Sequence, residues 1–126
     1  MDFLSKWPEA FALPDMKAET VARIFIERTV CQYGALKVLL SDWGANFLSA
    51  IVIEITNLCN IQKISTTAYH PQMNGMVEHF NLMIYTMYVS GHHRDWDKFI
   101  PYVLFVYRTS KHKSTGETPF FIMYGR

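Results

Sequence analysis

Two acidic residues stand where carboxylates could bind a metal ion. Asp42 follows the apolar run Val38–Leu40, and Glu78 lies near the start of an expected helix, with 35 residues between them. Ligands gather at the carboxyl ends of strands in open α/β sheets, so a strand-end carboxylate and a helix carboxylate can converge on one divalent ion. That pairing suggests phosphoryl transfer on nucleic acid. Each residue alone has a simpler explanation, Asp42 as a turn residue and Glu78 as a favourable charge in a first helical turn.

An alternation of strands and helices must position these carboxylates. The clearest helix is 16–33, where apolar residues recur at helical spacing between Asp15, a candidate N-cap, and Gly34. Strands are expected at 1–4 (the end of a strand), 7–13, 37–41 and 61–67. Further helices are expected at 47–60, at 76–90, at 96–107 with Asp95 as the cap, and from Thr118–Pro119 onward. Residues 68–75 are expected to form a mobile loop. This order predicts an α/β fold with a mixed sheet.

Composition limits the function classes without choosing one. The 126 residues suffice for one domain, half of them are apolar, and the net charge is only +1. The apolar stretches are too short for a membrane span, and no secretory signal opens the chain. These features exclude a membrane partner but leave the compartment open, since Lys111-His112-Lys113 is too short to be a nuclear signal; the expected location is intracellular, with the nucleus as one alternative.

The histidines, cysteines and serines form no recognised site of their own. Spacings typical of structural zinc are absent, as is the Gly-x-Ser-x-Gly elbow of α/β hydrolases. Cys31 and Cys59 lie among apolar residues, so we expect buried, reduced thiols. His70 and His92-His93 are more simply explained as hydrogen-bonding or helix-end residues.

Taken in order, the motifs resemble the integrase catalytic core of gypsy-type long-terminal-repeat retrotransposons, akin to retroviral integrase. The matching stretches cover nearly the whole chain: FLSKWPEA (3–10), LSD (40–42) with Gly44 and Asn46-Phe47, TTAYHPQ (66–72), Gly75, VE (77–78), FN (80–81), WD (96–97), YRTS (107–110) and STGETPF (114–120). No single piece is decisive, but the ordered series is specific.

The resemblance implies a ribonuclease-H-like mixed sheet flanked by helices and a catalytic Asp, Asp, Glu triad. Asp42 and Glu78 match the second and third positions, whose carboxylates hold Mg²⁺ or Mn²⁺ for DNA strand transfer. The remaining residues that the resemblance places against DNA are Tyr69, Gln72, Asn74 and His79.

Two departures from the family pattern bear on activity. The leading Asp and its strand are not found, because Asp2 matches a second-strand residue outside the triad; we therefore expect a core incomplete at its N-terminus and little or no catalysis. The helix after Glu78 carries His79, Leu82 and Tyr85 where the family usually has cations, so we expect weak DNA binding.

Alternatives follow from these departures. The chain could be a non-catalytic module that binds protein or DNA, with the aromatic helix 96–107 as a homodimer face. It could also be a transposon relic that does not fold stably, since a lost inner strand exposes a sheet edge. Neither alternative, nor the integrase hypothesis, involves a small-molecule substrate.

Overall fold

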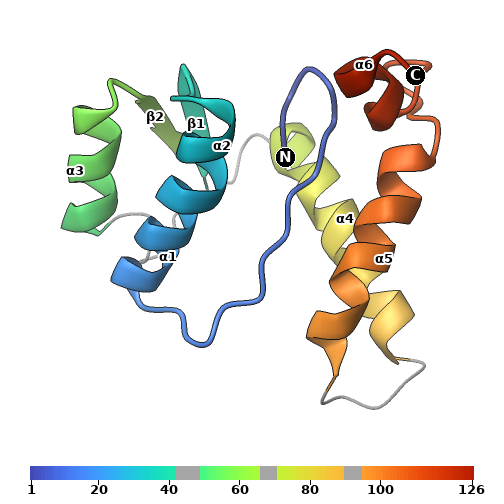
Figure 1. Ribbon diagram of the computed structural model, residues 1–126, viewed down its shortest axis with the longest axis horizontal. Coiled ribbons are helices and arrows are strands. Elements are labelled where there is room, and N and C mark those ends of the chain that lie inside the picture. Colours follow the sequence, from blue (N-terminus) through green and yellow to red (C-terminus); the bar gives the residue numbers. More distant parts are fainter. Residues whose placement is uncertain (42–48, 66–70, 90–94) are drawn as a thin grey trace. The chain divides into compact units, whose positions relative to one another are not determined.

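The computed structural model describes residues 1–41, 49–65, 71–89 and 95–126, which fall into two units by their contacts. Unit one comprises Met1–Ala12 and Gly75–Arg126, and unit two comprises Leu13–Asn74. Figure 1 shows the elements in chain order: α1 (Ala18–Phe25), a π-helical turn η1 (Ile26–Val30), α2 (Cys31–Tyr33), β1 (Val38–Ser41), α3 (Ala50–Leu58), β2 (Gln62–Ser65), α4 (Pro71–Val89), α5 (Trp96–Thr109) and α6 (Pro119–Tyr124).

Unit two contains a parallel pair of strands joined through α3. β1 pairs with β2 in a register that sets Val38 opposite Gln62 and Ser41 opposite Ser65. Parallel neighbours need a crossover, which α3 supplies. Buried Val52 and Thr56 lie on α3, and the Thr56 hydroxyl donates to the Val52 carbonyl at 3.0 Å. The strands predicted at 37–41 and 61–67 are confirmed over the described residues.

The helical segment of unit two begins later than predicted. It starts at Ala18, with Lys17 at the N-cap, and continues through η1 and α2 to Tyr33. Asp15 is therefore not the cap; its carboxylate accepts from the Lys17 amide at 2.9 Å, and hydrogen bonds from Thr20 and Lys17 lower the pKa of its carboxyl. The stop at Gly34 is confirmed by its positive φ of 88°.

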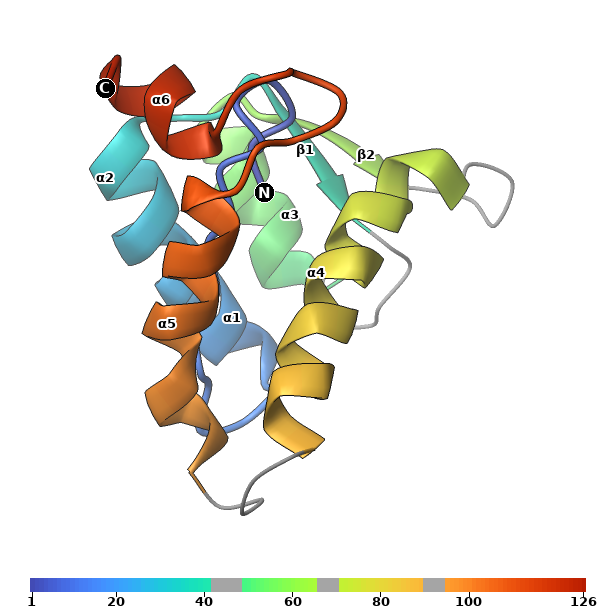
Figure 2. The same cartoon turned by 90° about the vertical axis from the view of Figure 1, so that its right-hand side faces the viewer.

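The core of unit one lies between α4 and α5, drawn in yellow and orange in Figure 2. Its buried members are Phe80, Ile100, Val103, Leu104 and Tyr107, with Ala10, Met83 and Ile84 packed against them. The Phe80 and Tyr107 rings meet edge to face, with centroids 5.2 Å apart. This packing fixes which side of each helix faces outward.

The strands predicted at 1–4 and 7–13 are wrong. Residues 1–7 form a turn in which the Asp2 amide donates to the Trp7 carbonyl at 2.9 Å and Lys6 adopts a φ of 60°. The Asp2 carboxylate accepts from the Ser5 amide at 2.7 Å and hydroxyl at 2.6 Å. Such local side-chain bonds compete with strand pairing, which also needs a partner strand. Residues 8–13 carry no strand pairing.

Two helix starts in unit one test the predicted caps. At α6 the Thr118 hydroxyl accepts from the Phe121 amide at 3.0 Å and Pro119 stands in the first turn, as predicted. At α5 Asp95 is in the cap position, but its side chain does not cap; it pairs with Lys98 at 3.2 Å. The carboxylate therefore stabilises an exposed side chain instead of the helix amides.

The predictions of buried thiols and of no membrane span can also be compared with the structure. Cys31 is exposed and Cys59 is half-buried, so the predicted burial of both thiols is wrong for Cys31. It lies near the end of a helical segment, where one side remains open to solvent. Over the described residues, no helix has the length and apolarity needed to cross a membrane.

Candidate active site

Glu78 lies on the exposed side of α4, as its position outside the apolar stripe predicted. The helix begins at Pro71, so Glu78 stands about two turns inside it and not in its first turn. The helix-dipole explanation therefore fails, because that effect fades beyond the first turn. Phe80 is buried on the other side of the helix, which holds the Glu78 backbone in place while the carboxylate faces outward.

Asp42 lies outside the described residues. It directly follows β1, which ends at Ser41, so the expected strand-end position agrees with the strand as far as it is described. Asp42 belongs to unit two and Glu78 to unit one. The convergence of the two carboxylates remains a prediction.

The four residues expected to contact DNA have different settings. Tyr69 lies outside the described residues. Gln72 and Asn74 were expected in a mobile loop, but the backbone from Pro71 onward is helical, so the loop prediction is wrong for 71–75. The local reason is that proline at a first helical position has the φ a helix needs and lacks only an amide that would be unpaired there. His79 is exposed on α4 beside Glu78.

The outward side of α4 is apolar beyond Glu78. Leu82 and Tyr85 follow Glu78 at helical spacing and are 58% and 62% exposed. The sequence of α4 contains no lysine or arginine. A carboxylate followed by apolar side chains offers little attraction to phosphate groups unless a bound cation offsets its charge.

The donor chemistry at the candidate site suits a hard cation. Carboxylate oxygens are the ligands that Mg²⁺ and Mn²⁺ prefer. Over the described residues, no three or more His, Cys, Asp or Glu side chains are grouped to hold a metal ion. Asp2, the first acidic residue of the chain, is engaged by Ser5; although burial opposes its charged form, these hydrogen bonds lower the pKa of its carboxyl.

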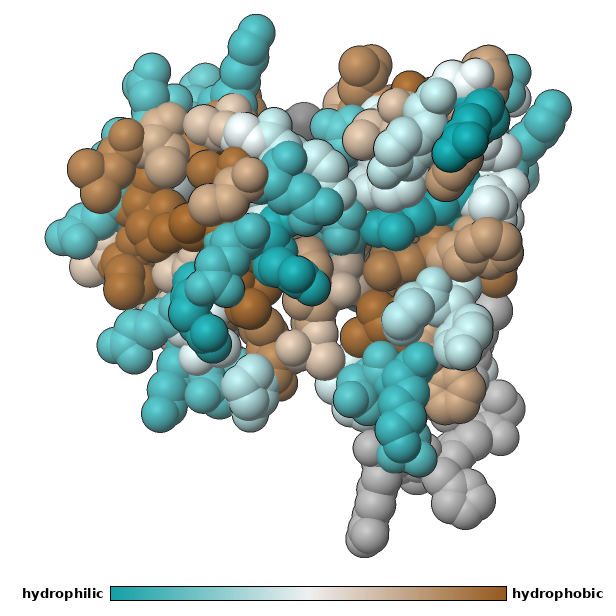
Figure 3. Space-filling view, viewed as in Figure 1, coloured by the Kyte–Doolittle hydropathy of each residue, from teal (hydrophilic) through white to brown (hydrophobic). Residues whose placement is uncertain are grey.

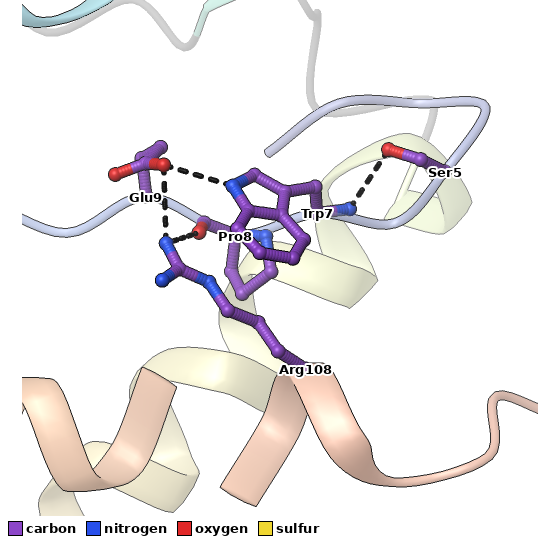
Figure 4. Close-up of polar contacts among 5 residues, drawn as sticks. All are labelled: Ser5, Trp7, Pro8, Glu9 and Arg108. Atoms are coloured by element: carbon purple, nitrogen blue, oxygen red, sulfur yellow. Dashed lines mark hydrogen bonds and ion pairs between the residues drawn. The ribbon is translucent and has the colours of Figure 1, made fainter. Parts of the chain in front are cut away.

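Sequence reasoning missed a polar network that holds the amino-terminal segment against α5. Figure 4 shows Arg108 donating to the Pro8 carbonyl at 2.8 Å and to the Glu9 carboxylate at 3.0 Å, while the Trp7 indole donates to the same carboxylate at 2.9 Å. The guanidinium also lies 4.0 Å from the Trp7 ring centroid. The sequence offered one sign of this network, which is that Trp7 and Arg108 both belong to motifs on which the family resemblance rests.

A second network missed from the sequence centres on His112. Its ring contacts the Tyr107 hydroxyl at 2.8 Å and the Ser114 hydroxyl at 3.2 Å. Burial, followed by the charges of Lys6 and His79, lowers the pKa of His112. Burial raises the pKa of Tyr107. Lys6 and His79 are distant from His112 in the sequence, so only the tertiary structure reveals their effect on it.

Comparison with known proteins gives sequence relatives that include Pol and Gag-Pol polyproteins. The chain is 29% identical over 126 residues to the retrovirus-related Pol polyprotein from transposon 412 of Drosophila melanogaster. It is 33% identical over 129 residues to the Gag-Pol polyprotein of feline leukemia virus, and 30% identical over 129 residues to the Pol polyprotein of radiation murine leukemia virus. These alignments cover 98%, 99% and 99% of the chain but only 10%, 8% and 22% of the relatives.

The fold also has a solved counterpart. The chain superposes on the catalytic core domain of BIV integrase with a TM-score of 0.71, at 21% sequence identity, covering 94% of this chain and 78% of that one. No protein-family profile matches the sequence. The superposition confirms the expected fold class, and the sequence relatives agree with the resemblance seen in the motifs.

Proposed function

Because the chain is an integrase-like core domain, similar to Pol polyproteins of retroviruses and retrotransposons, we propose that it takes part in DNA integration. The observation that carries the proposal is the outward-facing Glu78 on α4, within the fold of an integrase core. The 35-residue interval between Asp42, the residue after β1 in the sequence, and Glu78 supports it. This role implies an intracellular place of action, in the nucleus where the target DNA is nuclear.

Asp42 and Glu78 would hold the divalent ion. When bound, Mg²⁺ or Mn²⁺ supplies activation of an attacking water or DNA 3′-hydroxyl and stabilises the leaving oxygen. The chain's own contribution would be the Glu78 carboxylate, on a helix anchored by Phe80, and the carboxylate of Asp42, which follows β1 in the sequence. Tyr69, Gln72, Asn74 and His79 would contact the DNA beside them.

We propose that these 126 residues alone carry out little or no strand transfer. Two triad positions are matched, and Asp2 is occupied in its turn with Ser5. A strand-transfer assay in Mg²⁺ or Mn²⁺ tests this directly. Activity that disappears in Asp42→Asn would overturn the proposed inactivity while supporting the proposed site.

Metal binding by Asp42 and Glu78 is a testable prediction. We expect Asp42→Asn and Glu78→Gln each to weaken Mn²⁺ binding about tenfold or more, since each removes a charged oxygen ligand. Isothermal titration, or Mn²⁺ broadening of NMR resonances, measures the affinity. Asp97→Asn removes an exposed carboxylate from the first turn of α5 and serves as the control. Equal losses in all three variants would contradict a specific site.

A non-catalytic binding module is the second candidate function. It is favoured by the apolar side chains on the outer side of α5, where Tyr102 is 70% and Phe105 is 66% exposed. A helix buried on one side and apolar on the other normally has a second partner. A second copy of the chain would fit this face, so self-association distinguishes this candidate.

A further inference from the structure

His112 organises the loop that joins α5 to α6. Its backbone amide donates to the Glu117 carbonyl at 3.0 Å, and its carbonyl accepts from the Gly116 amide at 2.8 Å. Its half-buried ring contacts the Tyr107 hydroxyl through Nε2 and the Ser114 hydroxyl through Nδ1. One residue therefore closes the loop on itself and ties it to α5.

The amino-terminal turn lies against the same network. The Tyr107 hydroxyl, which bonds to His112, also lies 3.9 Å from Met1 Sδ. At the end of that turn Lys6 is only 7% exposed. Its ammonium group donates to the Phe3 carbonyl at 2.6 Å and lies 4.2 Å from the Phe3 ring centroid. No carboxylate among the described residues forms an ion pair with this ammonium.

The charges around His112 are mainly positive. Burial is the first cause that opposes its charged form, and Lys6 in the amino-terminal turn and His79 on α4 then act on it as like charges. Tyr107 is the titratable group on α5, and burial favours its neutral form. The turn also carries the Met1 amino group and Asp2, while Lys111, Lys113 and Glu117 are exposed on the loop itself. The carboxylate of Asp2 is already held by Ser5.

We propose that neutral His112 is a latch that holds the loop 110–118 on α5 through Tyr107, the residue that also contacts the amino-terminal turn, and that mild acid weakens this latch. Protonation need not break the two ring hydrogen bonds, because a hydroxyl group accepts as readily as it donates. The cost comes first from burial, because a charged imidazole would be desolvated in a partly buried place, and then from the like charges of Lys6 and His79.

The direction of the pH effect follows from the lowered pKa. The unfolded chain protonates His112 near pH 6.5, whereas the folded chain resists protonation to a lower pH. The stabilisation is therefore complete above about pH 6.5 and is lost as the pH falls towards the folded-state pKa.

Thermal unfolding between pH 7.5 and 5.5, above the main carboxylate range, tests the latch. We expect the Tm of the native chain to fall by about 3 °C or more across this range, and the Tm of His112→Gln to change less. Glutamine keeps a donor and an acceptor but does not titrate. The other four histidines are common to both proteins, so the difference isolates His112. Equal pH dependence in the two proteins would overturn the proposal.

NMR titration of the His112 ring gives a second measurement that does not depend on the variant folding. We expect its midpoint to lie below 6.5 in the native chain and to rise in Lys6→Met, which retains a long side chain without the charge. Lys111→Met, which removes an exposed lysine from the same loop, should leave the midpoint unchanged. A native midpoint at or above 6.5, or no response to Lys6→Met, would refute the latch.

Discussion

At the residue scale, Arg108 makes the most concentrated set of long-range contacts described for unit one. It reaches two acceptors about a hundred residues away in sequence and stacks on Trp7. Its side chain is 21% exposed and that of Glu9 is 24% exposed, so their ion pair is partly shielded from water. A shielded pair with additional hydrogen bonds contributes more than an exposed one, and its loss removes the guanidinium that offsets the Glu9 charge.

We expect Arg108→Met to lower the free energy of unfolding by about 2 kcal/mol, below the full cost of breaking a buried pair because this pair is partly exposed. Urea denaturation measures the loss. Lys98→Met is the matched control, since its ion pair with Asp95 is exposed on both sides and should contribute less than about 0.5 kcal/mol. Similar losses in the two variants would show that the Arg108 network is no stronger than a surface ion pair.

At the element scale, the exposed side of α4 carries a candidate catalytic carboxylate, Glu78, next to uncharged side chains. Glu78, Leu82 and Tyr85 lie on one exposed stripe, opposite the buried Phe80. Phosphate neutralisation by lysine and arginine dominates non-specific DNA affinity. If DNA lies along this stripe, as the proposed function requires, its affinity should depend only weakly on salt.

Adding charge to the stripe should reverse this behaviour. We expect Leu82→Lys and Tyr85→Lys each to tighten duplex binding and to steepen the slope of log affinity against log salt by up to about 0.9. Fluorescence anisotropy between about 50 and 200 mM salt measures both quantities. Tyr102→Lys adds the same charge on α5 and is the control. An equal effect at Tyr102 would mean that DNA does not lie along α4 in particular.

At the scale of the whole molecule, apolar side chains remain exposed on both units. On α5 the exposed members are Phe99, Tyr102, Phe105 and Val106. In unit two Ile53 and Leu58 are exposed on α3, and Figure 3 shows hydrophobic residues gathered on the side of that unit that bears α3. Soluble monomers rarely leave large contiguous apolar areas uncovered, so such faces indicate association.

We expect the chain to self-associate at micromolar concentration through α5. The double variant Tyr102→Lys, Phe105→Lys should shift it towards monomer, because two ammonium groups would have to be desolvated in the interface. Sedimentation velocity over a concentration series measures the shift. Ile53→Lys places the same charge on an exposed apolar position of α3, and a larger shift in that variant would assign the association to α3 instead. A native chain that sediments as a monomer would remove the support for the binding-module candidate.

Elements with strong local signals were predictable from the sequence. The start of α6 was predictable from Thr118 and Pro119 alone, since a cap hydroxyl and a proline act on the nearest backbone amides. The strand β1 was predictable because its short apolar run lies between Gly34 and Gly44 in the sequence. The family resemblance and its fold were readable too, because they depend on the order of motifs. The roles of Asp42 and Glu78 remain predictions from that order.

Only the tertiary structure decided features that depend on distant partners. Residues 1–13 have strand-like composition, yet Asp2 and Ser5 satisfy the backbone locally and residues 8–13 are not in a strand. Glu78 appeared to be in a first helical turn until the helix was seen to begin at Pro71. The ion pair of Arg108 with Glu9 joins segments about a hundred residues apart, and the effect of the Lys6 charge on His112 likewise depends on the fold. Spacing along a chain determines local periodicity and caps, whereas the free energy of burying a charge depends on neighbours that only folding supplies.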